Sequence, residues 1–168
     1  MGLLIVKSDF IGKYALATST KGNDNIDAYI AEYEEQILID LLGLELFKLF
    51  KDDVDSGTKK PLTSIYLTLY DRLNFEYCGR LLTSFGIKNI LLSIIFFYYV
   101  RDNTIKQTIN GDVKIQSEVS QPVDQTYLLL RYNEAIMAYS VIQRYCLENE
   151  TDVYPTFKGV YKQIASLI

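Results

Sequence analysis

The hydrophobic pattern is most regular between residues 26 and 42, where apolar side chains recur at spacings of three and four. This is the repeat of an amphipathic helix, with Asp24 or Asn25 as its N-cap and Gly43 suited to end it. The acidic residues of this segment mostly lie off the apolar stripe. A second short amphipathic helix is expected from Leu44 to about Asp53. The stripe consists of Ile26, Tyr29, Ile30, Tyr33, Ile37, Leu38 and Leu41.

Two other segments of the N-terminal half carry less regular patterns. Ser8 and Asp9 suit the start of a helix, which predicts a short helix reaching about Ala17. Residues 62–77 are ambiguous, because Pro61 could open a helix whereas the apolar residues alternate as in a strand. We favour a short helix there, followed by a link between two glycines. The alternating residues are Ile65, Leu67 and Leu69.

Residues 86–102 form the most apolar stretch, interrupted between Ile90 and Val100 only by Ser93. The apolar residues cover all sides of a helix, so this helix is predicted to lie at the centre of a bundle. The stretch is about half as long as a membrane-spanning helix. Ile94 and Phe97 lie in its middle, and we expect both to be almost fully buried.

Residues 104–119 change to short alternation around Asn110-Gly111, which is typical of a β-hairpin. A two-residue turn there would pair Ile109 with Asp112, whereas a three-residue turn would pair Ile109 with Val113. We favour the second register because it gathers the apolar residues on one face. This face either folds onto the chain's own helices or reaches a neighbouring subunit, and we assign it as an assembly interface. Its residues are Ile105, Ile109, Val113, Ile115 and Val119.

The last long helix is predicted from Asp124 to about Glu148, and Pro155 can open a short terminal helix that reaches Leu167. Together these elements predict a mainly α fold, a helical bundle with a long central helix and one projecting β-hairpin. The length of 168 residues suits a single domain spanning 1–168, with the hairpin as an insertion at about 104–119.

Composition removes several classes of chemistry. The chain has no His, which excludes His-based nucleophilic catalysis and His-ligated metals. Cys78 and Cys146 are far apart and are interpreted as reduced thiols. The apolar stretch from Leu3 to Val6 is too short for a signal sequence, so we expect a soluble intracellular protein without a membrane segment.

The residue spacing of each candidate site differs from the spacing that the corresponding ligand requires. Asp53-Val54-Asp55-Ser56-Gly57 resembles the start of a calcium loop, but Thr58 stands where glycine is needed and Ser64 where a bidentate glutamate is needed. The nine glycines never fall into a phosphate-binding spacing. We therefore predict no catalytic residue, no cofactor and no metal, and hence no enzyme.

Surface composition points instead to other proteins. The net charge of −4 disfavours general nucleic-acid binding, and no predicted helix is basic as a DNA-recognition helix would be. The 14 Tyr and 8 Phe residues are more than a domain of this size is expected to bury, so some should face partner subunits. The main alternative is a helical bundle that binds a small ligand, or an enzyme without His-based chemistry.

The order of these elements resembles that of the head–tail connector (adaptor or ring) proteins of tailed bacteriophages, and in particular the version in crAss-like phages. The similarity covers about residues 25–168 and rests on no catalytic motif. The segments that carry it are YEEQILIDLLGLELFKLF (33–50), GIKNILL (86–92), FYYVRD (97–102), TINGDVK (108–114) followed by Ser117-Glu118, and YPTFKG (154–159).

The resemblance implies a small, mainly helical structural protein of the virion. Members form a ring, typically of twelve copies, beneath the portal of the DNA-filled head. They bridge the portal to the tail or to further ring proteins, and the genome passes through their channel during packaging and ejection without specific binding. The resemblance thus implies a homo-oligomer that assembles in the host cytoplasm and resides at the head–tail junction.

Overall fold

The computed structural model describes residues 2–15, 25–108, 111–114, 125–149, 153–154 and 157–162. For residues 104–108, 111–114 and 125 it describes the backbone alone. The protein is mainly helical, as expected from the sequence, and it also carries small antiparallel β-hairpins. Its α-helices are α1 (Ile26–Leu42), α2 (Leu44–Asp53), α3 (Ser64–Tyr70), α4 (Ile87–Thr104) and α5 (Gln125–Glu148).

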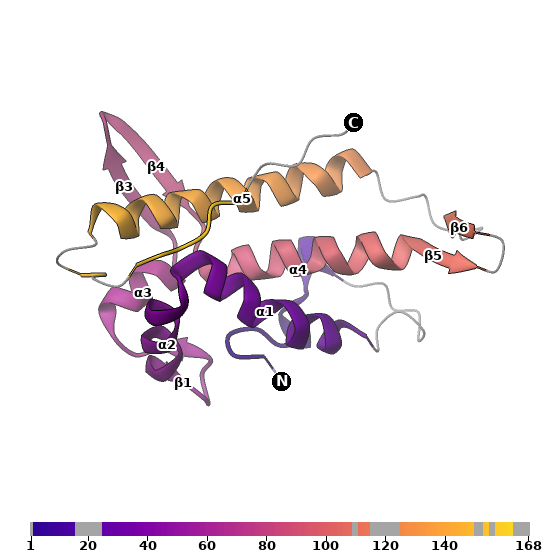
Figure 1. Ribbon diagram of the computed structural model, residues 1–168, viewed down its shortest axis with the longest axis horizontal. Coiled ribbons are helices and arrows are strands. Elements are labelled where there is room, and N and C mark those ends of the chain that lie inside the picture. Colours follow the sequence, from indigo (N-terminus) through magenta and orange to yellow (C-terminus); the bar gives the residue numbers. More distant parts are fainter. Residues whose placement is uncertain are drawn as a thin grey trace.

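The three longest helices lie side by side, and α4 packs against both α1 and α5 (Figure 1). The N-terminal two thirds of α4 supply much of the core, and Ile94 is fully buried as expected. Phe97 is only partly buried, so that expectation was wrong. From Phe96 onward most side chains of α4 are partly exposed, because the neighbouring helices do not enclose this end completely. The residues buried on α4 are Ile87, Ile90, Leu91, Leu92, Ser93, Ile94, Ile95 and Tyr99.

Gly43 separates α1 from α2, as the sequence predicts. Its φ of 80° lies in the left-handed region, which a residue without Cβ adopts without strain. A Cβ at this position would also lie 2.8 Å from the backbone of Lys158, so the C-terminal segment crosses directly over the break. The buried residues of α2 are Leu46, Phe47 and Phe50.

The N-terminal segment differs from the expected helix between Asp9 and Ala17. It contains two 3₁₀ turns, Lys7–Asp9 and Gly12–Tyr14. Gly12 has a φ of 59°, which interrupts any α-helix, and the Asp9 carboxylate accepts the Val6 N–H at 2.9 Å to close the first turn. The segment is nevertheless well packed, with four side chains buried in the core: Leu4, Ile5, Phe10 and Tyr14.

The described chain contains three two-stranded antiparallel sheets, whereas one hairpin was expected. Residues 62–77 hold both a helix and a strand, since α3 is followed by β3 (Leu73–Tyr77), which pairs with β4 (Arg80–Ser84). The connection is a two-residue turn, Cys78-Gly79, with φ values of 49° and 71° that match the twist of a tight hairpin. Pro61 does not open α3. It lies in β2 (Lys60–Pro61), which pairs with β1 (Val54–Asp55).

The expected hairpin after α4 is present as β5 (Ile105–Thr108) and β6 (Gly111–Lys114). The β3–β4 and β5–β6 hairpins lie at opposite ends of the molecule (Figure 1). Its register differs from the one we favoured. Val113 pairs with Lys106, and Ile105 pairs with Lys114, so Val113 does not oppose Ile109. The other register we considered is not observed either, because Asp112 pairs with Gln107 and not with Ile109. The observed pairing places Ile105 and Val113 on opposite faces of the hairpin, so these two do not share the apolar face that we expected.

The described part of the helix predicted from Pro155, residues 157–162, is not helical. It runs across the end of α1. The backbone N–H of Val160 donates to Asp40 O at 2.6 Å, and that of Lys158 donates to Leu42 O at 3.4 Å. The segment thus satisfies carbonyl groups that the last turn of a helix leaves without partners.

Candidate assembly interface

A cluster of aromatic side chains, contributed by α1, α4 and α5, lies toward the C-terminal end of α4. Its rings contact one another in a continuous series. Tyr33 and Tyr98 have centroids 4.7 Å apart, and Phe97 and Tyr132 have centroids 4.5 Å apart. All of these rings are partly exposed. We name this set the aromatic cluster: Tyr29, Tyr33, Phe97, Tyr98 and Tyr132.

Charged groups border the aromatic cluster on one side. The Arg101 guanidinium lies 4.9 Å from the ring centroid of Tyr98, and its Nε donates to Asp102 Oδ1 at 2.6 Å. Burial, together with the neighbouring Tyr98, raises the pKa of Tyr132 to about 12. The Tyr132 hydroxyl is therefore neutral at physiological pH and offers one donor. Aromatic residues and Arg are enriched in protein–protein interfaces, and Tyr and Arg often contribute much of the binding energy.

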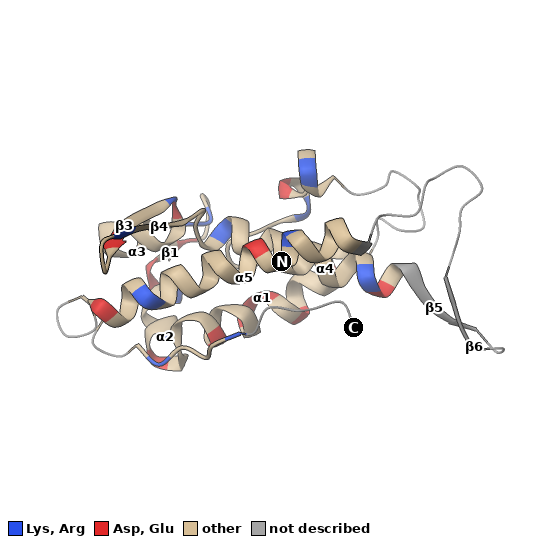
Figure 2. Cartoon of the chain, turned by 90° about the horizontal axis from the view of Figure 1, so that it is seen from above, with Lys and Arg blue, Asp and Glu red and all other residues tan. Residues whose placement is uncertain are grey.

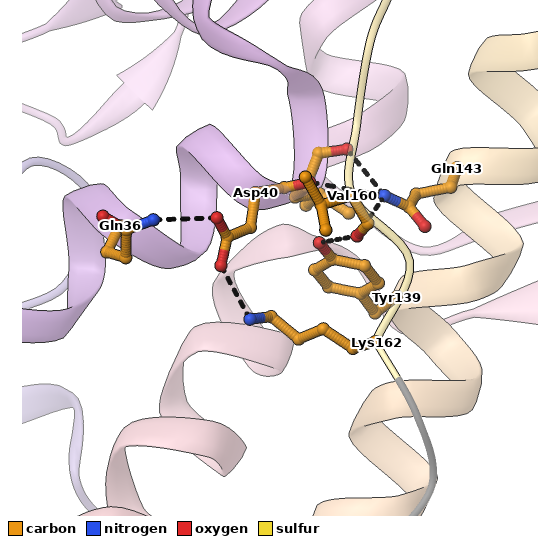
Figure 3. A network of polar contacts seen from close by, with 7 residues as sticks. Gln36, Asp40, Tyr139, Gln143, Val160 and Lys162 are labelled. Atoms are coloured by element: carbon orange, nitrogen blue, oxygen red, sulfur yellow. Dashed lines mark hydrogen bonds and ion pairs between the residues drawn. The ribbon is translucent and has the colours of Figure 1, made fainter.

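The C-terminal segment is fixed by a polar network between α1 and α5 (Figure 3). Val160 O accepts hydrogen bonds from the Tyr139 hydroxyl at 2.8 Å and from Gln143 Nε2 at 3.0 Å. Lys162 Nζ pairs with Asp40 Oδ2 at 2.8 Å, and Asp40 also accepts from Gln36. Tyr139 and Gln143 are both completely buried, so the segment is bonded to side chains of the core, although its own Val160 and Tyr161 are exposed.

Gly159 allows the C-terminal segment to lie against the helices. A Cβ on this residue would stand 2.3 Å from Leu41 O and 2.5 Å from Gln143 Nε2, closer than any real contact. Gln143 Nε2 points toward main-chain carbonyls, while its Oε1 is buried without a partner in the described structure.

One carboxylate binds three consecutive amide groups of the N-terminal segment. Glu34 on α1 is almost fully buried, and its two oxygens accept the backbone N–H groups of Leu3, Leu4 and Ile5 at 2.6, 2.8 and 3.0 Å. Burial raises the pKa of Glu34, and the three N–H bonds partly offset this effect. Glu34 was expected mostly off the apolar stripe of its helix, yet it lies on the buried face.

The outer face of α5 carries exposed apolar side chains in a row. Tyr127, Leu130 and Met137 are 51%, 57% and 53% exposed, and Val141 is partly exposed between them and the end of the helix. Figure 2 views this helix from above, and few of its residues are charged. Glu134, which is also exposed, lies on this face between Leu130 and Met137 and interrupts the row. Exposed apolar side chains gathered on one face of a helix make it a candidate contact surface.

Two surface hollows in the described part of the chain are candidate sites for a small ligand. One, of about 350 Å³, is lined by Glu34, Lys51 and Lys59, and the other, of about 290 Å³, by Lys60, Arg72 and Lys88. Neither contains a nucleophile paired with a base. The carboxylates of Asp53 and Asp55, which resembled a calcium loop, accept backbone N–H groups from residues 58–63.

Across the described residues, no group of three or more His, Cys, Asp or Glu side chains is placed to hold a metal ion. None of the described helices is long and apolar enough to span a membrane. Neither absence identifies a function.

The five residues assigned to the assembly interface are only partly placed by the structure. Ile105 and Val113 lie in β5 and β6, whereas Ile109, Ile115 and Val119 lie outside the described residues. Their assembly role remains a prediction. The aromatic excess indicates an interface without locating it. The apolar pattern of residues 124–148 predicts the core-facing stripe of α5 and does not reveal the exposed row. Comparison with known protein families, curated proteins and solved structures found no match.

Proposed function

We propose that this protein is a structural virion component, a head–tail connector that forms a ring beneath the portal and leaves a channel for DNA. The observation that carries the proposal is the order of elements on which the family resemblance rests. Helix α1, the break at Gly43, helix α2, the apolar helix α4, the β5–β6 hairpin and helix α5 follow one another in that order.

The surface supports an assembly role. A ring subunit needs contacts on two different faces, because head-to-tail association closes a ring only through unlike surfaces. The described chain has two candidate surfaces, the aromatic cluster and the β5–β6 hairpin that follows α4. In this proposal the long helix α4 forms the centre of the subunit and the β5–β6 hairpin projects toward a neighbour.

The charge of the chain suits a channel for DNA. With 21 acidic and 17 basic residues, the protein has little capacity to neutralise phosphates. A wall that repels the backbone lets DNA slide during packaging and ejection. No specific binding of DNA is required.

The test is direct imaging of the assembly. The purified full chain is examined by native mass spectrometry and negative-stain microscopy, alone and mixed with a portal protein from the same genome. We expect a ring, typically of twelve copies, free or bound to the portal. A chain that stays monomeric and never binds portal contradicts the proposal.

A further inference from the structure

The central part of the exposed face of α5 has a self-complementary arrangement. Met137 and Val141 stand two positions on either side of residue 139. Glu134 and Arg144 stand five positions on either side of the same point. Glu134 is exposed, and Arg144 is partly exposed.

This symmetry matters because two antiparallel helices related by a two-fold axis place position 139 + n of one at the level of position 139 − n of the other. With the axis at residue 139, Met137 meets Val141 of a second copy, and Glu134 meets the level of Arg144. The contact contains two Glu134–Arg144 pairs, one for each direction, and each pair joins opposite charges. A helix packed in the parallel sense would align like residues instead, setting Glu134 beside Glu134.

We propose that the outer face of α5 binds the same face of a second copy of this chain in an antiparallel, two-fold contact centred at residue 139. Met137 and Val141, the two apolar residues of the row nearest the axis, supply apolar area to be removed from water. The charge pattern selects the partner, because complementary charges fix register and reject wrong pairings.

The surroundings of the face are compatible with this contact. Ser140, next to the axis, is small and bonds its hydroxyl to Ile136 O at 2.9 Å, so it adds no bulk. The Arg144 guanidinium rests 4.9 Å from the ring centroid of Tyr77 on the β3–β4 hairpin. This stacking limits the freedom of the guanidinium and reduces the entropy lost on pairing.

The contact goes beyond the proposed connector and does not rest on it. A two-fold contact closes with two copies, whereas a ring requires contacts between unlike faces. The aromatic cluster and the α5 face can therefore serve different associations. A failure to form rings would leave the α5 pairing standing, and loss of the pairing would leave the ring untouched.

Charge reversal on the full chain tests the pairing. Sedimentation over a concentration series should show dimers for the natural sequence. Glu134→Arg and Arg144→Glu should each weaken this self-association by about tenfold or more, since each sets like charges opposite one another twice. The double variant Glu134→Arg/Arg144→Glu should restore it. Single variants that dimerise normally, or a double variant that does not recover, would overturn the proposal, as would a natural chain that is monomeric at every concentration.

If larger assemblies form, sedimentation no longer reports the α5 contact alone, and crosslinking tests whether the two α5 faces pair. In a Cys78→Ser background, Met137→Cys should be joined to its counterpart by a short bis-maleimide, because both lie close to the axis. Leu130→Cys is the matched control. It is equally exposed, but its nine-position distance from the axis separates the two copies by about 27 Å along the helices. Crosslinking at residue 130 but not at residue 137 would exclude the two-fold contact.

Discussion

The backbone N–H of Leu4 donates to Glu34 Oε1 at 2.8 Å, joining two residues 30 positions apart. Both are buried, and the same carboxylate also accepts from Leu3 and Ile5. One side chain of α1 therefore satisfies three consecutive amide groups that would otherwise lose water without a replacement. The N-terminal segment depends on this carboxylate for its place in the core.

Replacing Glu34 should detach the N-terminal segment. Glu34→Ala leaves three amide groups without an acceptor, and we expect the free energy of unfolding to fall by about 2–4 kcal/mol. Urea denaturation measures the change. Glu35→Ala is the matched control, because Glu35 is exposed and pairs only with Lys51 across 3.4 Å, so its loss should cost less than about 1 kcal/mol. Equal losses for the two variants would show that the three hydrogen bonds to Glu34 add no more stability than the surface ion pair of Glu35.

The Glu34 contribution should depend on pH in a defined direction. Burial raises its folded-state pKa above the value near 4.3 of an unfolded chain. The folded state thus holds the proton more tightly, and the contribution is full below about pH 4 and declines as the pH rises through the folded-state pKa. The stability difference between the natural chain and Glu34→Ala should therefore narrow from pH 4 toward neutrality. A stability difference that widens over this pH range would mean that folding lowers the pKa of Glu34 and does not raise it.

Adding one methyl group at Gly159 should displace the C-terminal segment from α1 and α5. In Gly159→Ala the new Cβ would meet Leu41 O and Gln143 Nε2, so the segment must move away. We expect a loss of about 1–3 kcal/mol in stability and faster proteolysis after α5. Gly57→Ala is the control, since its Cβ would meet only the Asp55 side chain, at 3.4 Å, and should change neither property. Unaltered proteolysis of Gly159→Ala would argue against the network in Figure 3.

Two neighbouring residues of α4 should respond differently to truncation. Ile94 is completely buried, so Ile94→Ala should cost about 2–5 kcal/mol. Phe97 is partly exposed and contacts Tyr132, so Phe97→Ala should cost less, despite removing a larger side chain. Thermal unfolding of both variants checks this order. A larger loss for Phe97 would mean that the aromatic cluster is part of the core and not a surface.

Sequence patterns located the elements that depend on local chemistry. The stripe of α1, the glycine at position 43 and the apolar length of α4 each act within a few residues, and each prediction held. The β3–β4 hairpin was missed because its turn uses Cys78 at a positive φ, which is no common turn signal. Glu34 was missed as a buried group because its partners lie about 30 residues away.

The aromatic cluster should contribute to assembly more than to folding. Tyr33→Ala removes one partly exposed ring from the series and leaves its neighbour Tyr98 in place. The pair of rings is worth about 0.5–1.5 kcal/mol to the fold. If the cluster is covered by another subunit, the same change removes a contact of the kind that costs 2 kcal/mol or more in an interface, an order of magnitude or more in affinity.

The two roles separate when melting and assembly are measured on the same variant. Tyr33→Ala should keep its helical circular dichroism and lose only a few degrees of melting temperature, while ring formation or portal binding fails. Tyr161→Ala is the control, because Tyr161 is 63% exposed and lies in the C-terminal segment, outside the cluster. A Tyr33→Ala chain that melts early yet assembles normally would place these rings inside the subunit, and the interface would have to be sought at the β5–β6 hairpin.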